Sequence, residues 1–361
     1  MNSVQPGLQL FERLARGVTA HVMTFQRRTF NTWRRTIAAV GGYKLGDFVL
    51  TEEDFSPYEM KVFFDENIGR RIVESTGGIT TWEGEIVRME LTLQGVTYAI
   101  SLDYELWHNR VKVAFTDNAT SVPTATAWVE DTTSSAIYGE CEYLDTVNKN
   151  YDLTAAEALR DRRLNENAYP SARPEGGLQS FVAREQQQLN ILHVYCAGYV
   201  FSMNRRYLES LLAAAAVSDQ ITTLVGNSEF VTVGQIDTNA LSMPVECSDI
   251  SQRLWNAIED LILVGDASGN RWVGGVYADR RFYYNLAETT VTHYWRNGQL
   301  YDLHQIPMLP TMIKPDTIVR VTGAIPAITT SGANTWANAS NMYVDEVEFI
   351  APDQYRLLPA Y

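Results

Sequence analysis

The sequence contains few cysteines and no long hydrophobic segment. Its three cysteines, Cys141, Cys196 and Cys247, are far apart in a chain of 361 residues. Such spacing supports neither a disulfide framework nor a cysteine-based metal site, and it fits synthesis in a reducing cytoplasm. No run of about 18 apolar residues is present, and the first residues lack the basic-then-apolar order of a signal peptide. We therefore expect neither a membrane-spanning helix nor a disulfide-stabilised secreted domain.

Sequence motifs for catalysis are also lacking. There is no G-x-x-x-x-G-K-[ST] phosphate loop, no G-x-G-x-x-G turn and no G-x-S-x-G nucleophile elbow. The five histidines never form H-x-x-H or H-x-x-x-H pairs, which argues against zinc, and His193 is expected to be a core residue. Residues 266–277 resemble a calcium loop faintly, but Tyr277 stands where a bidentate glutamate is needed, so we interpret them as a helix-to-hairpin turn. The prediction is a non-enzymatic protein with no cofactor and no metal.

Charge of one sign dominates, but unevenly. The chain carries 29 basic and 43 acidic residues, a net charge of −14. Residues 1–40 hold six arginines against one acid, a net of +5, so the remaining 23 basic and 42 acidic residues carry −19. An acidic body repels phosphate backbones, which argues against sequence-specific DNA binding. We interpret residues 1–40 as a basic docking segment, with a solvated face as the alternative. The candidate docking residues are Arg27, Arg28, Arg34 and Arg35.

Alternating apolar residues predict a fold dominated by antiparallel strands. Such alternation marks residues 87–93, 96–102 and 111–115, with Gln94-Gly95 as the turn between the first two strands. Residues 82–86 place their apolar side chains on the opposite parity from residues 87–93, and this phase change predicts a β-bulge or a change of packed face. Further strands are predicted in residues 22–50 (with turns at 41–43 and 45–47), 60–64, 189–203 (buried on both faces), 221–245, 270–284 (a hairpin) and 342–358 (a strand pair).

Helices are predicted between these strands. Apolar residues at helical spacing indicate a short amphipathic helix in residues 7–20, and another short helix is expected near 205–216. Thr154 begins a T-x-x-E capping box ahead of a strongly helix-forming run. The clearest helix lies in residues 248–266, where Gly265 suits the left-handed stop.

The predicted fold class is therefore α+β, predominantly antiparallel β. A segment dense in proline and glycine, residues 169–177, indicates a domain boundary or a long connection. The predicted divisions are the basic segment 1–40, a first β-rich domain 41–175, a connecting region with a buried strand 176–245, and a helix followed by a second β-rich region 246–361.

Three short motifs follow one another in a defined order. They are W-E-G with Trp82 and Gly84, N-R-V with Asn109, Arg110 and Val111, and Y-G with Tyr138 and Gly139. A helix and a proline-rich link come next, and the second half adds "LWNAIEDLI" and "GDASGNRWVGGVYADRRFYY". In order and spacing this series resembles the hub proteins at the tail tip of tailed bacteriophages, which close the tail tube and carry the baseplate.

The resemblance implies two β-barrel-like tube domains per chain, with inserted helices and smaller accessory domains, in a homotrimeric ring within the virion tail. A hexamer is also possible. The implied partners are a tail tube or distal tail ring protein, a tape measure protein and tail fibre or tip proteins, while viral DNA would slide through an acidic channel without specific binding. Two alternatives remain open. One is a hexameric distal-tail or tube ring protein, and the other is a carbohydrate-binding or carbohydrate-active tail module that uses the abundant aromatic residues.

Overall fold

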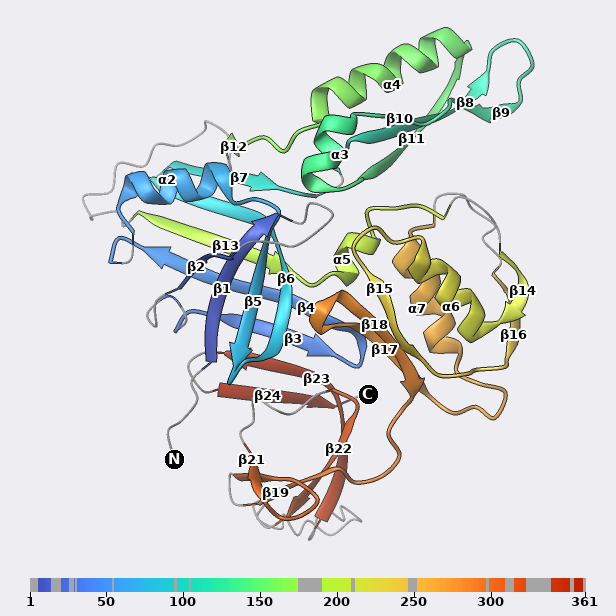
Figure 1. The fold of residues 1–361 in the computed structure, drawn as a ribbon. Helices are drawn as coiled ribbons and strands as arrows, with labels where there is room; N and C mark the ends of the chain where they lie inside the picture. Colours follow the sequence, from blue (N-terminus) through green and yellow to red (C-terminus); the bar gives the residue numbers. More distant parts are fainter. Residues whose placement is uncertain are drawn as a thin grey trace, which may run out of the picture.

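Strands predominate in the structure, in agreement with the predicted α+β class. This computed structural model describes residues 6–13, 21–25, 29, 31–53, 55–93, 96–103, 105–174, 190–208, 212–245, 252–296, 299–308, 315–322, 339–350 and 354–359. Figure 1 shows a central sheet with three further parts around it: an α/β unit at the top, a unit containing two adjacent helices at the right, and C-terminal strands at the bottom.

The central sheet joins strands from distant parts of the sequence. Its order is β2-β1-β5-β6-β13-β4-β3, and every neighbouring pair is antiparallel. The strands are β1 (Pro6–Arg13), β2 (His21–Thr24), β3 (Arg34–Ala38), β4 (Val40–Thr51), β5 (Arg70–Thr76), β6 (Ile79–Leu93) and β13 (Ile191–Ala197). β7 (Val96–Ser101) pairs with the second half of β6, and β12 (Arg173–Pro174) pairs with β7. The pairings of the described residues show no closed barrel.

Several predictions for the first 70 residues are wrong. Of the amphipathic helix expected in residues 7–20, residues 7–13 form strand β1 instead, because Leu8 and Leu10 both point into the core while the strand pairs with β5; residues 14–20 lie outside the described residues. The turns expected at 41–43 and 45–47 lie inside the continuous strand β4.

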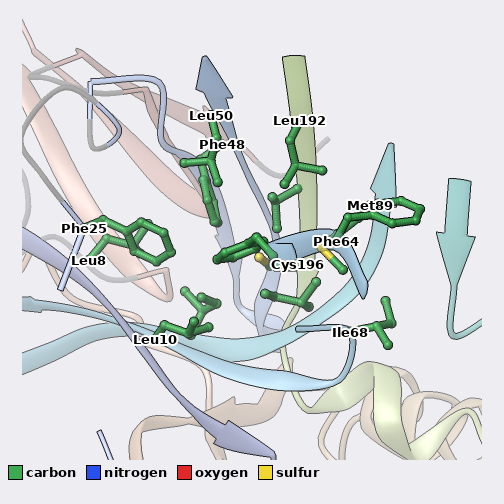
Figure 2. Packing of buried hydrophobic residues seen from close by; sticks show 14 of the residues in the cluster. Leu8, Leu10, Phe25, Phe48, Leu50, Phe64, Ile68, Met89, Leu192 and Cys196 are labelled. Atoms are coloured by element: carbon green, nitrogen blue, oxygen red, sulfur yellow. The ribbon is translucent and has the colours of Figure 1, made fainter. Parts of the chain in front are cut away.

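The strand expected at residues 60–64 is helix α2 (Pro57–Glu66). Ser56 and Glu59 form a capping box, and proline occupies the first turn, so the local sequence specifies a helix start. Met60, Phe63 and Phe64 are buried. Figure 2 shows the core that α2 helps to close, with Phe64 beside Met89 of β6 and Leu192 of β13.

The bulge predicted in the W-E-G strand is confirmed. Tyr195 of β13 lies opposite Arg88, but the next residue, Cys196, lies opposite Ile86, so Val87 is the extra residue in β6. The extra residue reverses the face on which the following side chains lie. It explains why Trp82, Gly84 and Ile86 are buried with one parity and Met89 and Leu91 with the other.

Strand β13, from the region predicted to connect two domains, lies at the centre of the sheet between β4 and β6. The sequence predicts burial on both of its faces, but only one face is buried. Leu192 and Val194 are fully buried, whereas His193 and Tyr195 are partly exposed on the opposite face. His193 is therefore not a core histidine: it contacts Tyr195 and Asp47 near the surface.

The α/β unit is inserted between β7 and β12. Its central strand β8 (Arg110–Asp117) pairs in parallel with β11 (Glu142–Tyr151) and in antiparallel with β9 (Pro123–Ala125) and β10 (Val129–Glu130). Helices α3 (Thr132–Tyr138) and α4 (Leu153–Asn167) complete the unit. The helix expected from Thr154 is present, but the carboxylate of Asp152 caps it, accepting from Ala155 N.

The unit at the right of Figure 1 follows β13 and contains α5 (Val200–Met203), α6 (Val217–Gly226) and α7 (Leu254–Val264). Its strands are β14 (Leu212–Ala216), β16 (Ser242–Val245), β15 (Thr232–Ile236), β17 (Trp272–Tyr277) and β18 (Arg281–Leu286). The prediction of α7, ending at Gly265 with φ of 76°, is confirmed, as is the hairpin β17–β18. The prediction of a helix near 205–216 is wrong, because residues 212–216 form a strand and α6 starts at residue 217.

The C-terminal part is built from strands only in the described residues. They are β19 (His293–Arg296), β20 (Gln299–Tyr301), β21 (Pro307–Met308), β22 (Thr317–Thr322), β23 (Ala339–Ile350) and β24 (Gln354–Pro359). The predicted strand pair β23–β24 is confirmed. β23 also pairs with β3, so the C-terminal strands extend the central sheet.

Candidate functional site

The motif residues gather where the α/β unit meets the central sheet and the α6–α7 unit. Five of the seven lie within the α/β unit, at the start of β8 and the end of α3. Trp82 and Gly84 lie on β6 of the central sheet. Arg205, which follows α5, links the two groups: it pairs with Glu85 of β6, and its guanidinium carbon lies 5.5 Å from the centre of the Trp107 ring.

Asn109 fastens the start of β8 to the end of α3. Its side-chain amide donates to the carbonyl oxygen of Gly139 at 2.8 Å and accepts from the backbone N–H of Cys141 at 2.8 Å. The side chain is fully buried. Gly139 has φ of 80°, and a Cβ atom there would come within 2.3 Å of the Phe230 ring. Only glycine fits this junction, because both the backbone conformation and the packing exclude a side chain.

Aromatic packing completes the same corner. Trp107, just before the N-R-V motif, meets Tyr138 edge to face with ring centres 5.8 Å apart. Its indole N–H donates to the carbonyl oxygen of Ala168 at 3.0 Å. Val111, the last motif residue on β8, is fully buried and packs with Leu164 of α4. These contacts hold both ends of the inserted unit together.

Buried charges join the three parts. Arg205 is only 2% exposed and pairs with Glu85 at 2.5 Å. Burial raises the pKa of Glu85, and the Arg205 guanidinium opposes that rise. Such a pair is costly to break, since either partner alone would be an uncompensated buried charge. Sequence patterns do not identify Arg205, because its partner is far away in the chain and no local signal marks it.

A second group of charges lies at the start of β11. The buried carboxylate of Glu142 pairs with Arg110 and accepts from the backbone N–H of Tyr207 at 2.7 Å. Its backbone carbonyl accepts from Arg253, the residue before α7, at 3.0 Å. Glu142 therefore connects the α/β unit with the α6–α7 unit. Arg110 also lies over the Trp128 ring, at 5.3 Å from its centre.

On β6, Trp82 and Gly84 are packing residues. Trp82 is fully buried and meets Trp33 edge to face at 5.2 Å. At Gly84 a Cβ atom would lie 2.2 Å from the carbonyl oxygen of Ala197, so the neighbouring strand β13 can approach only a glycine.

Replacing Gly84 by alanine is expected to lower the free energy of unfolding by about 1–3 kcal/mol, the usual cost of overpacking. Gly7→Ala is the matched control, because Gly7 also lies in a strand but a Cβ atom added there would have no other atom within 4 Å. Thermal and denaturant unfolding of the two variants provide the measurement. Equal stability of both variants would contradict this account of Gly84.

The candidate docking arginines have different environments. Arg34 is exposed at the start of β3. Arg35 is 3% exposed, pairs with Glu74 and lies over the Phe349 ring, so its charge is neutralised inside the chain. Arg27 and Arg28 lie outside the described residues.

The turn that resembles a calcium loop is held by its own hydrogen bonds. The carboxylate of Asp266 accepts from the side chain and backbone of Asn270 at 3.0 Å each, and from the Trp272 indole at 3.1 Å. These bonds, chiefly those from Asn270, lower the pKa of Asp266 to about 2. The residues thus form the predicted turn from α7 to the β17–β18 hairpin.

Asp266→Asn is expected to lower the thermal midpoint at pH 7. Because the pKa of Asp266 is lower in the folded protein than in the unfolded chain, its carboxylate stabilises the fold fully above the unfolded pKa of 3.8. This stabilisation is lost as the pH falls through the folded-state pKa of about 2. The difference between wild type and variant should therefore shrink between pH 4 and pH 2, measured by circular dichroism. A difference that does not change with pH would show that the carboxylate has no such role.

The described residues were also compared with the requirements of a metal site and of a reactive thiol. Among these residues no three His, Cys, Asp or Glu side chains are grouped to hold a metal ion. Burial raises the pKa of the Cys141 thiol to about 12, so it stays protonated. No helix in the described part of the chain is long and apolar enough to cross a membrane.

Comparison with known proteins gives distant structural similarity alone. No family model matches the chain, and no curated protein matches its sequence. Among solved structures, it is similar to a crystal structure described as the tail protein from Neisseria meningitidis MC58. The TM-score is 0.44 at 7% sequence identity, and the alignment covers 96% of this chain and 92% of the other.

Proposed function

We propose that this chain is a structural protein of a phage tail and forms the ring-shaped hub at the tail tip. The observation that carries the proposal is the position of the motif residues. Several of those that resemble the hub family lie at the junction of three parts of the molecule, where the buried residues Asn109, Gly139 and Gly84 fix the backbone. These residues therefore determine how the parts of the molecule are joined. This is what we expect of a protein with a structural role.

The packing supports a rigid building block. The buried pair Arg205–Glu85 holds β6 of the sheet to the segment after α5, and Glu142 joins the α/β unit to the α6–α7 unit through its bonds from Tyr207 and Arg253. β23 continues the central sheet into the C-terminal strands. A subunit of a ring has to keep its shape while neighbouring subunits exert force on it. Close packing between the parts of the subunit makes it rigid enough to do so.

In this proposal the chain is non-enzymatic and acts in the virion, at the tail tip or baseplate. Three subunits would form the ring, in contact with a tail tube or distal tail ring protein, the tape measure protein and fibre or tip proteins. The acidic body would line the channel, because like-charge repulsion prevents phosphate contacts that would retain passing DNA.

The test is the subunit number of the assembled protein. We expect a trimeric ring with a central opening in electron micrographs, and a trimer mass by light scattering at high protein concentration. A six-subunit ring would instead identify a distal-tail or tube ring protein. A chain that stays monomeric at concentrations typical of assembly, and that is absent from tail tips labelled by an antibody, would overturn the proposal.

For the basic N-terminal segment we propose that Arg34 docks on an acidic surface of a neighbouring subunit. Deleting residues 1–40 cannot test this, because Leu8 and Trp33 belong to the core. Arg34→Ser is expected to weaken assembly at low salt and to have little effect at high salt, where surface charges are screened. Arg356→Ser is the control, since Arg356 is 63% exposed on β24. Unchanged assembly at low salt would contradict the proposal.

A further inference from the structure

A hollow lies at the neck that connects the central sheet with the inserted α/β unit. The chain leaves the sheet after β7 and returns through β12, which pairs with β7. The hollow has a volume of about 90 Å³, which accommodates a group of a few heavy atoms and is too small for a drug-sized ligand. It is lined by Arg88, Ala99, Ser101, Leu106, Ser171 and Arg173.

The strand register explains the hollow. Arg88 of β6 lies opposite Ser101 of β7, and Ala99 of β7 lies opposite Arg173 of β12. Because side chains alternate along a strand, Ala99 and Ser101 share one face, which is the face away from the core residue Ile100. The side chains of Ala99 and Ser101 thus form the floor of the hollow. A long arginine lies on each neighbouring strand, Arg88 on β6 and Arg173 on β12.

Arg88 is held in place by a chain of polar contacts across the sheet. Its Nε donates to Glu90 Oε1 at 2.8 Å, and Glu90 accepts from the Tyr195 hydroxyl at 3.3 Å. That hydroxyl also lies 3.0 Å from Nδ1 of His193. A guanidinium fixed in this way loses little side-chain entropy when it binds a ligand.

The side chains that line the hollow carry positive charge only, and Glu90, which is ion-paired with Arg88 at 2.8 Å, lies outside the lining. None of its six lining residues is acidic, and Arg173 makes no ion pair within the described residues. This is unusual in a chain with a net charge of −14. Guanidinium groups recognise carboxylate and phosphate oxygens in particular, because their N–H donors match the spacing of those oxygens.

Hydroxyl groups add donors at the same place. Ser101 Oγ accepts from the backbone N–H of Asp103 at 3.0 Å, which leaves the hydroxyl proton as a donor toward the hollow as far as the described residues show. Ser171, on the returning connection, is exposed and lines the hollow. Leu106 supplies an apolar wall. We infer that this hollow binds a small oxyanion group, phosphate or carboxylate, between Arg88, Arg173 and the two serines.

Oxyanion binding at the hollow is independent of the proposed tail function. A bound oxyanion would contact β6 and β7 on one side and the returning connection at residues 171–173 on the other. It would therefore link β12, the strand through which the chain returns, to β6 and β7 of the central sheet. The full chain should then become more stable when the ligand binds.

The experiment titrates the full chain with sodium phosphate and, separately, with sodium acetate, keeping the ionic strength constant with chloride. Calorimetry measures binding and thermal unfolding measures the shift of the midpoint. We expect saturable binding of at least one probe and a raised midpoint. Arg173→Ala should weaken binding about tenfold or more, as expected for losing a hydrogen bond from a charged group. Ala99→Leu, which fills the floor, should have a similar effect.

Arg162→Ala is the control, because Arg162 is 63% exposed on α4, away from the hollow. Its binding should equal that of the wild type. Binding of phosphate alone would identify a phosphate group as the ligand, and binding of both probes would extend it to carboxylates. No saturable binding by the wild type, or equal binding by the Arg173→Ala variant, would overturn the inference.

Discussion

Replacing Arg205 by alanine is expected to destabilise the protein more than any of the other substitutions proposed for this chain. The variant leaves Glu85 buried without its partner and removes the cation above Trp107. Breaking a buried ion pair in this way typically costs about 3–5 kcal/mol of stability. Denaturant unfolding followed by circular dichroism measures the loss.

The control for this prediction is Arg162→Ala, which removes an exposed arginine paired with Glu166 at 4.0 Å. Surface pairs of this kind contribute about 0–1 kcal/mol. If Arg205→Ala were no more destabilising than Arg162→Ala, the buried pair would not hold the parts of the molecule together.

The loss caused by Arg205→Ala should also depend on pH. Burial raises the pKa of Glu85, and without the guanidinium that opposes this rise the pKa moves higher still. A raised folded-state pKa means that the stabilisation is complete below the unfolded pKa and is lost as the pH rises through the folded one. The midpoint difference from wild type should therefore be larger at pH 8 than at pH 5. A loss of packing alone would give the same difference at both.

Asn109→Ala is the second change with a large expected effect. It removes both the donor to the Gly139 carbonyl and the acceptor for Cys141 N–H, in a fully buried position. Each unsatisfied buried group costs about 1–3 kcal/mol, so we expect a loss of about 2–4 kcal/mol. Thermal and denaturant unfolding measure it, with Asn148→Ala, an exposed residue on β11, as the control.

A second variant separates the hydrogen bonds of Asn109 from its volume. Asn109→Asp keeps the shape, and its protonated form can donate to the Gly139 carbonyl, whereas its carboxylate cannot. This variant should therefore gain stability relative to wild type as the pH falls toward 4. If Asn109→Ala behaved like the exposed control, Asn109 would not fasten β8 to α3.

The sequence is informative wherever the signal is local. The bulge in β6 is predictable because the parity of the apolar residues changes within a few positions, and Val87 is the extra residue. Helix α7 is predictable from its apolar stripe and from Gly265, whose positive φ ends it. The strand predicted at residues 60–64 is wrong although the signal for helix α2 is also local: Ser56, proline at the next position and Glu59 form a complete helix start.

The other wrong assignments lie where pairing with a distant strand decides the outcome. Residues 7–20 have an apolar spacing compatible with a helix, but pairing with β5 and β2 makes residues 6–13 a strand. Distant strands also decide the pairing of β13, which lies between β4 and β6, strands that come from the first hundred residues. Intrinsic preferences are small and tertiary pairing overrides them.

By itself, the sequence determined the β-rich class, the bulge in β6, helix α7 with its end at Gly265, and the order of the short motifs. These features depend on side-chain periodicity and backbone geometry over a few residues. Only the tertiary structure decided which charges meet, such as Arg205 with Glu85 and Arg110 with Glu142, and that Ala99 lies as a floor between two arginines. Those contacts join strands and loops far apart in the chain, and no local pattern encodes which distant segments become neighbours.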